Sequence, residues 1–317
     1  MKIIITGGAG FLGQQLALAL LRNEYGLNFG HLVLVDIQCP TSPINDPRVQ
    51  CITLDLAAEG TVEKLIDSES DILFHLAAIV SSHAEEDFDL GMKINFDVTR
   101  RLLESARIHN PALKFIFTSS LAVFGGNLPE IVTDEYAVNP QSSYGTQKAM
   151  CELMINDYSR KGYVDGRILR LPTISVRSGK PNKAASSFVS GIIRESLNGE
   201  KNVCPVSSSL ILWISSPDTV IKNIIHSVKI SAKEFTFSRI INLPGISITV
   251  DEMIDTLNNV AGQKIADLIS FEKNESINSI VESWPGNFDI SHSLSLGFNV
   301  DASFSENILT FIDNKKY

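Results

Sequence analysis

The sequence predicts an α/β protein built on a doubly wound parallel sheet, with a second, smaller domain towards the C-terminus. In the first half of the chain, apolar runs of strand length alternate five times with segments of helical periodicity. The first run ends in three glycines spaced by three residues, and later runs end in small or polar side chains. Parallel strands bring such ends to one edge of the sheet, where α/β proteins bind ligands.

The expected elements follow a regular order. Strands are expected at 3–5, 31–36, 49–54, 71–78 and 114–118, because each run is rich in apolar or β-branched residues. A long amphipathic helix is expected over 85–110, ended by Pro111, and another helix begins near Ser142. Beyond a sixth strand, helices are expected at 187–197, 217–228 and 250–260, and a strand at 240–243 is expected to rejoin the main sheet.

The turn after the first strand predicts a dinucleotide site in a Rossmann-like fold. Residues 6–13 read Thr-Gly-Gly-Ala-Gly-Phe-Leu-Gly. Gly7 permits the tight turn, Gly10 lets the backbone approach a pyrophosphate, and Gly13 lets the helix pack closely on the strand. The free N–H groups at the helix start then face the anion. A glycine triplet alone is weak evidence, and the flanking strand and helix give it weight.

Acidic residues at the ends of the second and third strands have two interpretations each. Asp36 lies 23 residues after Gly13, close to where the dinucleotide pattern places its ribose-binding carboxylate, and it would favour NAD over NADP by repelling a 2′-phosphate. The alternative is a turn acid at a strand end. Asp55 either accepts the adenine amino group or is a solvated turn carboxylate. His75, inside an apolar run, is interpreted as a hydrogen-bonded core histidine.

The helix that begins near Ser142 carries Tyr144 and Lys148 one turn apart. Residues four apart lie on one helix face, so the ammonium group is predicted to lower the pKa of the phenol towards working pH. Such a phenol is a general base or acid for a substrate with a hydroxyl group. The alternative is an exposed helix face, which is disfavoured here because Ser119 and Ser120 end a strand of the same predicted sheet.

Length and composition exclude several classes of protein. The chain has 317 residues, 44% hydrophobic and 20% charged, with a net charge of -9. The acidic balance argues against a nucleic-acid surface, and no apolar run is long enough to span a membrane. With no signal-peptide pattern, a cytoplasmic protein is expected. Four scattered cysteines form no metal-binding motif, so no metal is expected.

Together these motifs resemble the extended short-chain dehydrogenase/reductase family. The resemblance rests on Thr-Gly-Gly-x-Gly-Phe-x-Gly at 6–13, the acid at 36, Asp-Leu at 55–56, His-Leu-Ala-Ala at 75–78, an asparagine at 95, Thr-Ser-Ser at 118–120 and Tyr-x-x-x-Lys at 144–148. It implies hydride transfer to or from a nicotinamide. The cofactor-binding residues that it implies are Gly7, Gly10, Phe11, Leu12, Gly13, Asp36, Asp55, Leu56, Leu76, Ala77, Ala78, Asn95, Tyr144, Lys148 and Pro172.

The same resemblance assigns the chemical roles. Ser120 would hydrogen-bond the reacting hydroxyl, and Tyr144 would take its proton as the general base. Lys148 would hold the nicotinamide ribose and tune Tyr144, while Asn95 would support the network on the cofactor side. In relatives, the helices that bear Asn95 and Tyr144 form a four-helix interface, so a homodimer is expected.

The second half of the chain narrows the substrate. Thr173 stands where sugar-nucleotide epimerases typically carry an asparagine that helps to hold the diphosphate. The segments 140–148, 174–200, 212–217 and 242–250 look like a subgroup that uses NAD to oxidise the C2 hydroxyl of a four-carbon sugar acid to the 2-oxo acid. A nucleotide-sugar epimerase or dehydratase with tightly bound NAD is the alternative. A non-catalytic, dinucleotide-sensing protein is a remote third.

A polar loop after the sixth strand is the expected carboxylate site. Cations at 177, 180 and 183 and hydrogen-bonding side chains at 182, 186 and 187 suit a sugar acid, although a solvated loop is an equal alternative. The predicted substrate-binding residues are Ser81, Ser120, Tyr144, Thr173, Arg177, Lys180, Asn182 and Ser186. The NAD-binding domain is expected to span 1–173 and 215–245, and the substrate domain 174–214 and 246–317.

Overall fold

A computed structural model describes residues 1–317 except 180, 236 and 315–317. Its largest sheet has seven strands in the order β10-β6-β5-β4-β1-β2-β3. The pairs from β3 to β5 are parallel, and the chain reverses its direction of growth between β1 and β4. This is the predicted Rossmann-like, doubly wound fold, and ligands of such sheets bind where the strand order reverses.

The five predicted strands are all present in this sheet. They are β1 (Lys2–Thr6), β2 (His31–Asp36), β3 (Val49–Thr53), β4 (Ser70–His75) and β5 (Lys114–Ser120). The sixth strand is β6 (Asp165–Leu171), and β10 (Ile240–Asn242) rejoins the sheet as predicted. The strand predicted over 71–78 ends three residues early, at His75, and beyond it the N–H group of Ile79 donates to Asn95 Oδ1 (2.8 Å) instead of to a neighbouring strand.

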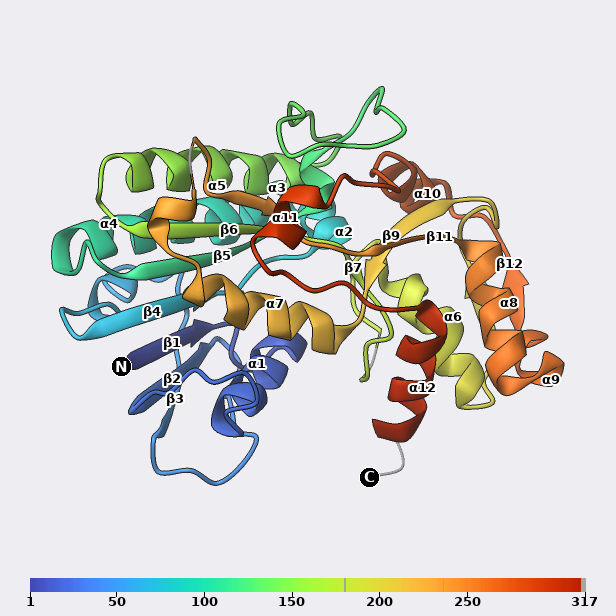
Figure 1. The fold of residues 1–317 in the computed structure, drawn as a ribbon, viewed down its shortest axis with the longest axis horizontal. Helices are drawn as coiled ribbons and strands as arrows, with labels where there is room; N and C mark the ends of the chain where they lie inside the picture. Colours follow the sequence, from blue (N-terminus) through green and yellow to red (C-terminus); the bar gives the residue numbers. More distant parts are fainter. Residues whose placement is uncertain (180, 236, 315–317) are drawn as a thin grey trace. The chain divides into compact units, whose positions relative to one another are not determined.

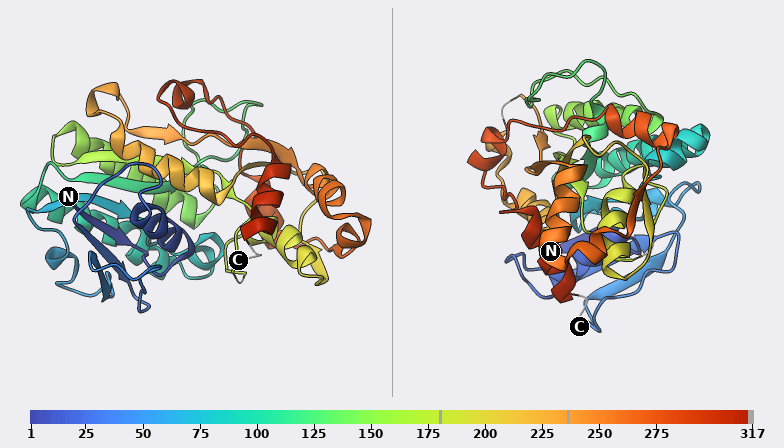
Figure 2. Two further views of the ribbon diagram at one scale, coloured as in Figure 1. Left: turned by 60° about the horizontal axis from the view of Figure 1, so that its bottom comes forward. Right: turned by 90° about the vertical axis from the view of Figure 1, so that its right-hand side faces the viewer.

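Helices cover both faces of the seven-stranded sheet. In Figure 1, α4 (Val98–His109) and α5 (Ser143–Arg160) lie on one side, and α1 (Phe11–Leu21) and α7 (Pro217–Lys229) lie on the other. The views of Figure 2 show the same two layers of helices from other directions. Ile3, Ile4 and Ile5 of β1 are fully buried, as expected for a strand covered on both faces.

The predicted helix over 85–110 is wrong as a single α-helix. The structure has α2 (Ser81–Glu86), α3 (Phe88–Gly91), a π-helical segment η2 (Met92–Asp97) and then α4. The side chain of Asp87 accepts a hydrogen bond from the N–H group of Leu90 and so begins α3 separately from α2. The π-helical segment contains Asn95, and such segments are frequent at functional sites.

The chain divides into two compact units. Unit 1 comprises Met1–Ser120, Ser143–Arg170 and Ile221–Ile241, and unit 2 comprises Leu121–Ser142, Leu171–Val220 and Asn242–Tyr317. The segment 121–142, which the sequence analysis grouped with the first domain, lies in unit 2. There the backbone of Val132 exchanges hydrogen bonds with Asn287 (3.1 Å) and Asp289 (2.9 Å).

Unit 2 has its own sheets and core. A three-stranded sheet has the order β11-β9-β7, built from β7 (Thr173–Ile174), β9 (Ile211–Ser215) and β11 (Ile246–Thr249). A second sheet pairs β8 (Asn202–Cys204) with β12 (Ile269–Phe271). The core of unit 2 includes buried side chains from α6 (Ser187–Leu197), α8 (Val250–Ala261), α10 (Glu275–Glu282) and α12 (Phe304–Asn314). A further short helix is α11 (Ser291–Ser295).

Candidate active site

The glycine turn between β1 and α1 has the shape that the sequence predicts. Gly7 has a φ of +75°, and a Cβ atom there would lie 2.8 Å from the backbone nitrogen of Ala77. At Gly13 a Cβ atom would collide with the carbonyl oxygen of Gly7, and at Gly10 it would approach the same oxygen to 3.2 Å. Gly7 and Gly13 therefore leave no room for a side chain, and Gly10 leaves little, so the backbone at this end of β1 is not covered by side chains of these residues.

The start of α1 and Asp36 fit a dinucleotide. Gly10 is the N-cap of α1 without a side-chain cap, and the first turn contains no acid, so the first N–H groups of the helix are available to an anion. Asp36 Oδ2 accepts from the N–H group of Ala9 (3.0 Å), and Oδ1 accepts from that of Gln38 (3.1 Å). The carboxylate is thereby fixed beside the glycine turn.

Other residues of the expected cofactor set lie near this turn or in the surrounding core. Ala77 packs against Gly7, and its N–H group donates to Thr6 Oγ1 (3.4 Å). Asp55 is exposed and accepts from the N–H group of Ala57 (2.8 Å), which gives it a turn function of its own. Leu56 belongs to the main core and is 8% exposed. The remaining partly buried members are Phe11, Leu12, Leu76 and Ala78.

The structure brings Ser120, Tyr144 and Lys148 together in unit 1. Ser120 is the last residue of β5, and Tyr144 and Lys148 lie on the first turns of α5. The hydroxyl groups of Ser120 and Tyr144 are hydrogen-bonded to each other. Lys148 Nζ donates to the carbonyl oxygen of Thr118 (2.8 Å) and lies 5.7 Å from the centre of the Tyr144 ring.

The predicted lowering of the Tyr144 pKa is wrong for this structure. Burial raises the pKa of Tyr144 to about 12, and the hydrogen bond with Ser120 acts in the opposite direction with a smaller effect. Burial also lowers the pKa of Lys148 to about 8. The Lys148 ammonium donates to the carbonyl oxygen of Thr118, and the raised pKa of Tyr144 favours the protonated phenol at neutral pH.

Asn95 connects the π-helical segment to α5. Its Nδ2 atom donates to the carbonyl oxygen of Ile79 (3.0 Å) and to Gln147 Oε1 (2.7 Å), and its own side-chain oxygen accepts from Ile79. Asn95 is 1% exposed and Gln147 is fully buried. The amide of Asn95 thus connects the chain after β4 to α5.

His75 is the core histidine that the sequence predicts. Its Nδ1 atom is 2.7 Å from Thr6 Oγ1, and its Nε2 atom is 3.0 Å from Thr99 Oγ1. Because Thr99 Oγ1 donates to the carbonyl oxygen of Asn95 (2.7 Å), the hydrogen bonds place the imidazole proton on Nε2. Burial lowers the pKa of His75 to about 3, so the ring is neutral.

In unit 2, the predicted carboxylate loop contains a partly buried arginine. Arg177 Nε is buried and has no hydrogen-bond partner among the residues that the structure describes. The backbone of Arg177 is fixed from both sides, because its N–H group donates to Ser190 Oγ (3.0 Å) and its carbonyl oxygen accepts from Arg194 Nη1 (2.9 Å). Burial and the nearby Arg194 lower the pKa of Arg177. An anion would complete this environment.

The other predicted substrate residues are more dispersed. Asn182 Oδ1 accepts from the N–H group of Ala184 (3.0 Å), and Ser186 is the N-cap residue of α6. Thr173 is 7% exposed in β7, next to the buried Pro172. Ser81, in unit 1, is 5% exposed at the start of α2. Lys180 lies outside the described residues.

Sequence reasoning missed Glu152 and Arg170. Both are buried, and they form a bidentate ion pair near Lys148. The spacing of Glu152, four residues after Lys148 on the same helix, is a signal that could have identified it. No comparable sequence signal identifies Arg170, because its partner is 18 residues away on another element.

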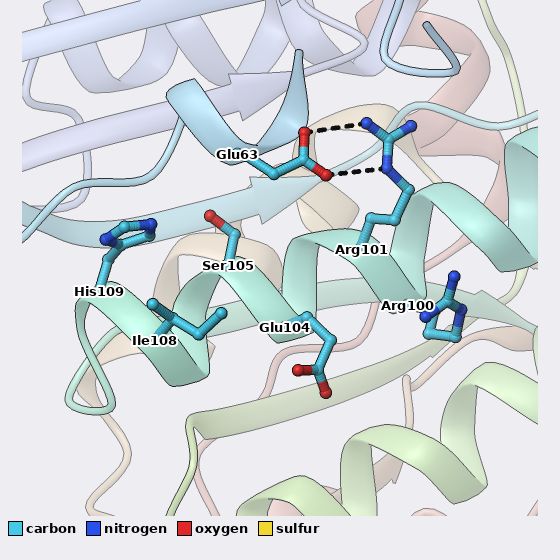
Figure 3. Close-up of a pocket in the computed structure, with 7 residues that line it drawn as sticks. All are labelled: Glu63, Arg100, Arg101, Glu104, Ser105, Ile108 and His109. Carbon is cyan, nitrogen blue, oxygen red and sulfur yellow. Dashed lines mark hydrogen bonds and ion pairs between the residues drawn. The ribbon is translucent and has the colours of Figure 1, made fainter. Parts of the chain in front are cut away.

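A separate hollow of about 390 Å³ lies along the outer face of α4. Figure 3 shows Arg100, Arg101, Glu104, Ser105, Ile108 and His109 projecting from this helix, with Glu63 opposite and paired with Arg101. None of these residues belongs to the predicted site.

In the described part of the chain, no group of histidine, cysteine and acidic residues is arranged to hold a metal ion, and no helix meets the length and hydropathy that a membrane span requires.

Known proteins resemble this chain over nearly its full length. D-erythronate dehydrogenase of Haemophilus influenzae is 55% identical, with 99% of each chain covered, and D-erythronate dehydrogenase of Cupriavidus necator is 46% identical, covering 99% of this chain and 98% of its own. A crystal structure described as the nucleoside-diphosphate-sugar epimerase of Agrobacterium tumefaciens has a TM-score of 0.93 at 42% identity, covering 99% of this chain and 94% of its own. The model of the NAD-dependent epimerase/dehydratase family matches residues 3–216, and the chain therefore belongs to that family.

Proposed function

We propose that the protein is an NAD-dependent dehydrogenase that oxidises the C2 hydroxyl group of D-erythronate, a four-carbon sugar acid, to the 2-oxo acid. The observation that carries the chemistry is the hydrogen bond between Ser120 and Tyr144, with Lys148 one helical turn further on. The full-length identity to two D-erythronate dehydrogenases supports the substrate. The bare glycine turn and the fixed carboxylate of Asp36 support NAD as the cofactor.

In this proposal, the protein's own groups handle the proton of the substrate hydroxyl. Ser120 donates a hydrogen bond to the C2 oxygen and orients it towards Tyr144. The deprotonated phenol of Tyr144 accepts the hydroxyl proton as the C–H bond at C2 breaks and the carbonyl group forms. When bound, NAD supplies the acceptor for the hydride that leaves C2. Lys148 holds the ribose of the cofactor, and its positive charge stabilises the phenolate.

The substrate carboxylate is assigned to Arg177. A guanidinium group with a buried, unpartnered Nε atom is suited to a carboxylate, because the two can form parallel hydrogen bonds. The polar side chains of Asn182 and Ser186 follow on the same loop and are assigned to the substrate hydroxyl groups. Unit 1 is accordingly proposed as the cofactor-binding part and unit 2 as the substrate-binding part.

A homodimer is proposed through the outer faces of α4 and α5. Ile108 on α4 is 64% exposed and Leu153 on α5 is 67% exposed, and apolar side chains of this size are typical of helix–helix interfaces.

The cytoplasm is the proposed location. Cys39 and Cys51 are exposed free thiols, which is characteristic of proteins in a reducing compartment.

A nucleotide-sugar epimerase with tightly bound NAD is the second candidate. It is favoured by the likeness to the structure described as a nucleoside-diphosphate-sugar epimerase from Agrobacterium tumefaciens, which has a TM-score of 0.93. Thr173, in place of the asparagine expected in such epimerases, counts against it. The two candidates differ in whether NADH accumulates, since an epimerase returns the hydride to its substrate.

The test is a screen for NADH formation with purified protein. D-erythronate, other four- and five-carbon sugar acids and UDP-sugars are offered with NAD and, separately, with NADP. We expect NADH formation with D-erythronate and no interconversion of UDP-sugars. Tyr144→Phe should abolish turnover while the protein still binds NAD. Full turnover of D-erythronate by Tyr144→Phe would contradict the proposed mechanism, and UDP-sugar interconversion without NADH would favour the epimerase.

A further inference from the structure

The face of α5 that carries Tyr144 and Lys148 continues with Glu152. Residues four apart stack on one side of a helix, so these three side chains form one row. Glu152 is 2% exposed, although carboxylates are almost never buried unless they are paired. A charged group held at this depth next to the proposed catalytic pair requires partners that fix its position.

Both oxygens of Glu152 are bound by residues from neighbouring strands. Arg170 donates from Nε to Oε1 (3.0 Å) and from Nη2 to Oε2 (2.7 Å), and Ser119 Oγ donates to Oε1 (2.5 Å). Arg170 is 4% exposed near the end of β6, and Ser119 is near the end of the adjacent strand β5. The carboxylate thus ties α5 to the ends of two strands.

The last three residues of β5 each bind a different member of the row. The carbonyl oxygen of Thr118 accepts from Lys148 (2.8 Å), Ser119 binds Glu152, and Ser120 is hydrogen-bonded to Tyr144. A rotation or slide of α5 against β5 would strain all three links together. Arg170 also binds Glu152, so the link between Ser119 and Glu152 is held from two strands. This link therefore keeps β5 and α5 aligned at the other two hydrogen bonds.

The charge of Glu152 also acts on Lys148. The titratable groups that face Lys148 are Tyr144, Cys151 and Glu152 from α5 and His75 from β4. His75 is neutral, and burial raises the pKa of the Cys151 thiol to about 11, so Glu152 is the anion of this group. Burial lowers the pKa of Lys148 to about 8, and Cys151 and then Glu152 act against this decrease.

We propose that Glu152 is a positioning residue of the reaction and that Arg170 anchors it. Glu152 keeps Lys148 charged and holds residues 118–120 in register with Tyr144. The proposal rests on the proposed roles of Tyr144 and Lys148. It assigns no contact between Glu152 and the substrate or cofactor. Its effect on Lys148 exists in the protein without cofactor and can be measured there.

The test is an NMR titration of Lys148 in cofactor-free protein labelled with ¹³C at the ε-carbon of lysine. The Lys148 signal is assigned by its loss in Lys148→Arg. Glu152→Gln removes the negative charge and leaves Arg170 positive, so we expect the pKa of Lys148 to fall by about one unit. Glu152→Asp restores the charge and should return the pKa towards the wild-type value. In turnover, Glu152→Gln should lower kcat much more than it changes KM for the sugar acid.

Asp165→Asn is the matched control. Asp165 pairs with Arg167, which is 1% exposed and lies on the same strand β6, so this variant also leaves a buried arginine without its carboxylate. We expect Asp165→Asn to lower Tm as Glu152→Gln does, with no change in the Lys148 titration. An equal Lys148 titration in wild type, Glu152→Gln and Asp165→Asn would overturn the proposal.

A double variant covers the case in which Glu152→Gln does not fold. Glu152→Gln with Arg170→Gln buries no unpaired charge, and the two amide side chains can still bond each other. The pKa of Lys148 should again be lower than in wild type, and an unchanged value would overturn the proposal. If wild-type protein oxidises no sugar acid with NAD, the proposed function fails, whereas the Lys148 titration still decides the role of Glu152.

Discussion

Burial sets the protonation of the two central side chains. The pKa of Tyr144 is raised to about 12 and that of Lys148 is lowered to about 8, each because its charged form is less well solvated in the protein. The phenol is therefore ready to donate a proton to a 2-oxo acid, whereas it must first lose its proton to act as a base in oxidation. The two directions of the reaction should depend on pH in opposite ways.

Oxidation of D-erythronate should accelerate as the pH rises through the neutral range. Below its pKa, the fraction of deprotonated Tyr144 increases about tenfold per pH unit, and this form is the base. Above about pH 8 the Lys148 ammonium loses its proton, so KM for NAD should increase there. Initial rates over a pH series, at saturating and limiting NAD, test the increase in rate and the increase in KM for NAD. Oxidation that slows steadily from neutral to alkaline pH at saturating NAD would contradict this assignment.

Asp36 should decide between NAD and NADP. Its carboxylate is fixed by the N–H groups of Ala9 and Gln38 beside the glycine turn, so it cannot easily move away from a 2′-phosphate. Asp36→Ser should reduce kcat/KM with NAD by about tenfold or more and increase it with NADP. Steady-state kinetics with the two cofactors measure the ratio. Asp55→Ser, at an exposed acid of the next strand end, is the control and should keep the preference for NAD.

At the scale of elements, the connection between β1 and α1 depends on close backbone approach. The carbonyl oxygen of Gly7 occupies the space that a side chain at Gly13 would need. The strand and helix can pack this tightly only when that position is glycine, and the helix start then points its free N–H groups at the turn. The same geometry thus allows close packing and leaves the helix start open for the proposed cofactor.

Gly13→Ala should therefore weaken NAD binding and destabilise the protein. The new methyl group forces the turn and α1 apart, which should raise Kd for NAD at least tenfold and lower Tm by several degrees. Calorimetric titration and thermal unfolding measure the two effects. Gly191→Ala in α6 is the matched control: the nearest atoms are 3.8 Å from its Cβ position, and alanine favours a helix. Equal behaviour of the two variants would rule out the steric argument.

At the scale of the whole molecule, the two units have separate cores and different tasks in the proposed reaction. Unit 1 carries the glycine turn and the row of Tyr144, Lys148 and Glu152, and unit 2 carries Arg177. Outside these regions, α4 and α5 expose the apolar side chains of Ile108 and Leu153. A second copy of the chain is the proposed occupant.

Leu153→Glu should convert a dimer into a monomer. Leu153 is 67% exposed on α5, and two carboxylates facing each other across a symmetric interface would repel. Light scattering during size-exclusion chromatography measures the molar mass. Leu309→Glu on α12, where the leucine is 49% exposed, is the control and should leave the mass unchanged. A wild-type protein that elutes as a monomer at micromolar concentration would exclude the proposed interface.

Local sequence patterns predicted much of the fold and part of the site. The alternation of strand and helix, the glycine turn, the return of the strand at 240–242 and the neutral core histidine His75 all depend on periodicity or on the chemistry of nearby residues. The break of the helix over 85–110 was not predictable in this way. Asp87 and the π-helical segment interrupt it, although its apolar spacing continues through both.

The sequence by itself determined the fold class, the glycine turn and the placement of Tyr144 and Lys148 on one helix face, because these depend on spacings of a few residues that fix a turn or one helix face. Only the tertiary structure shows that Tyr144 and Lys148 have pKa values shifted by burial and that Glu152 is paired with Arg170. Protonation depends on how deeply a group is buried, and burial is a property of the packed molecule. Glu152 depends on Arg170 and Ser119, which folding brings to it from two neighbouring strands.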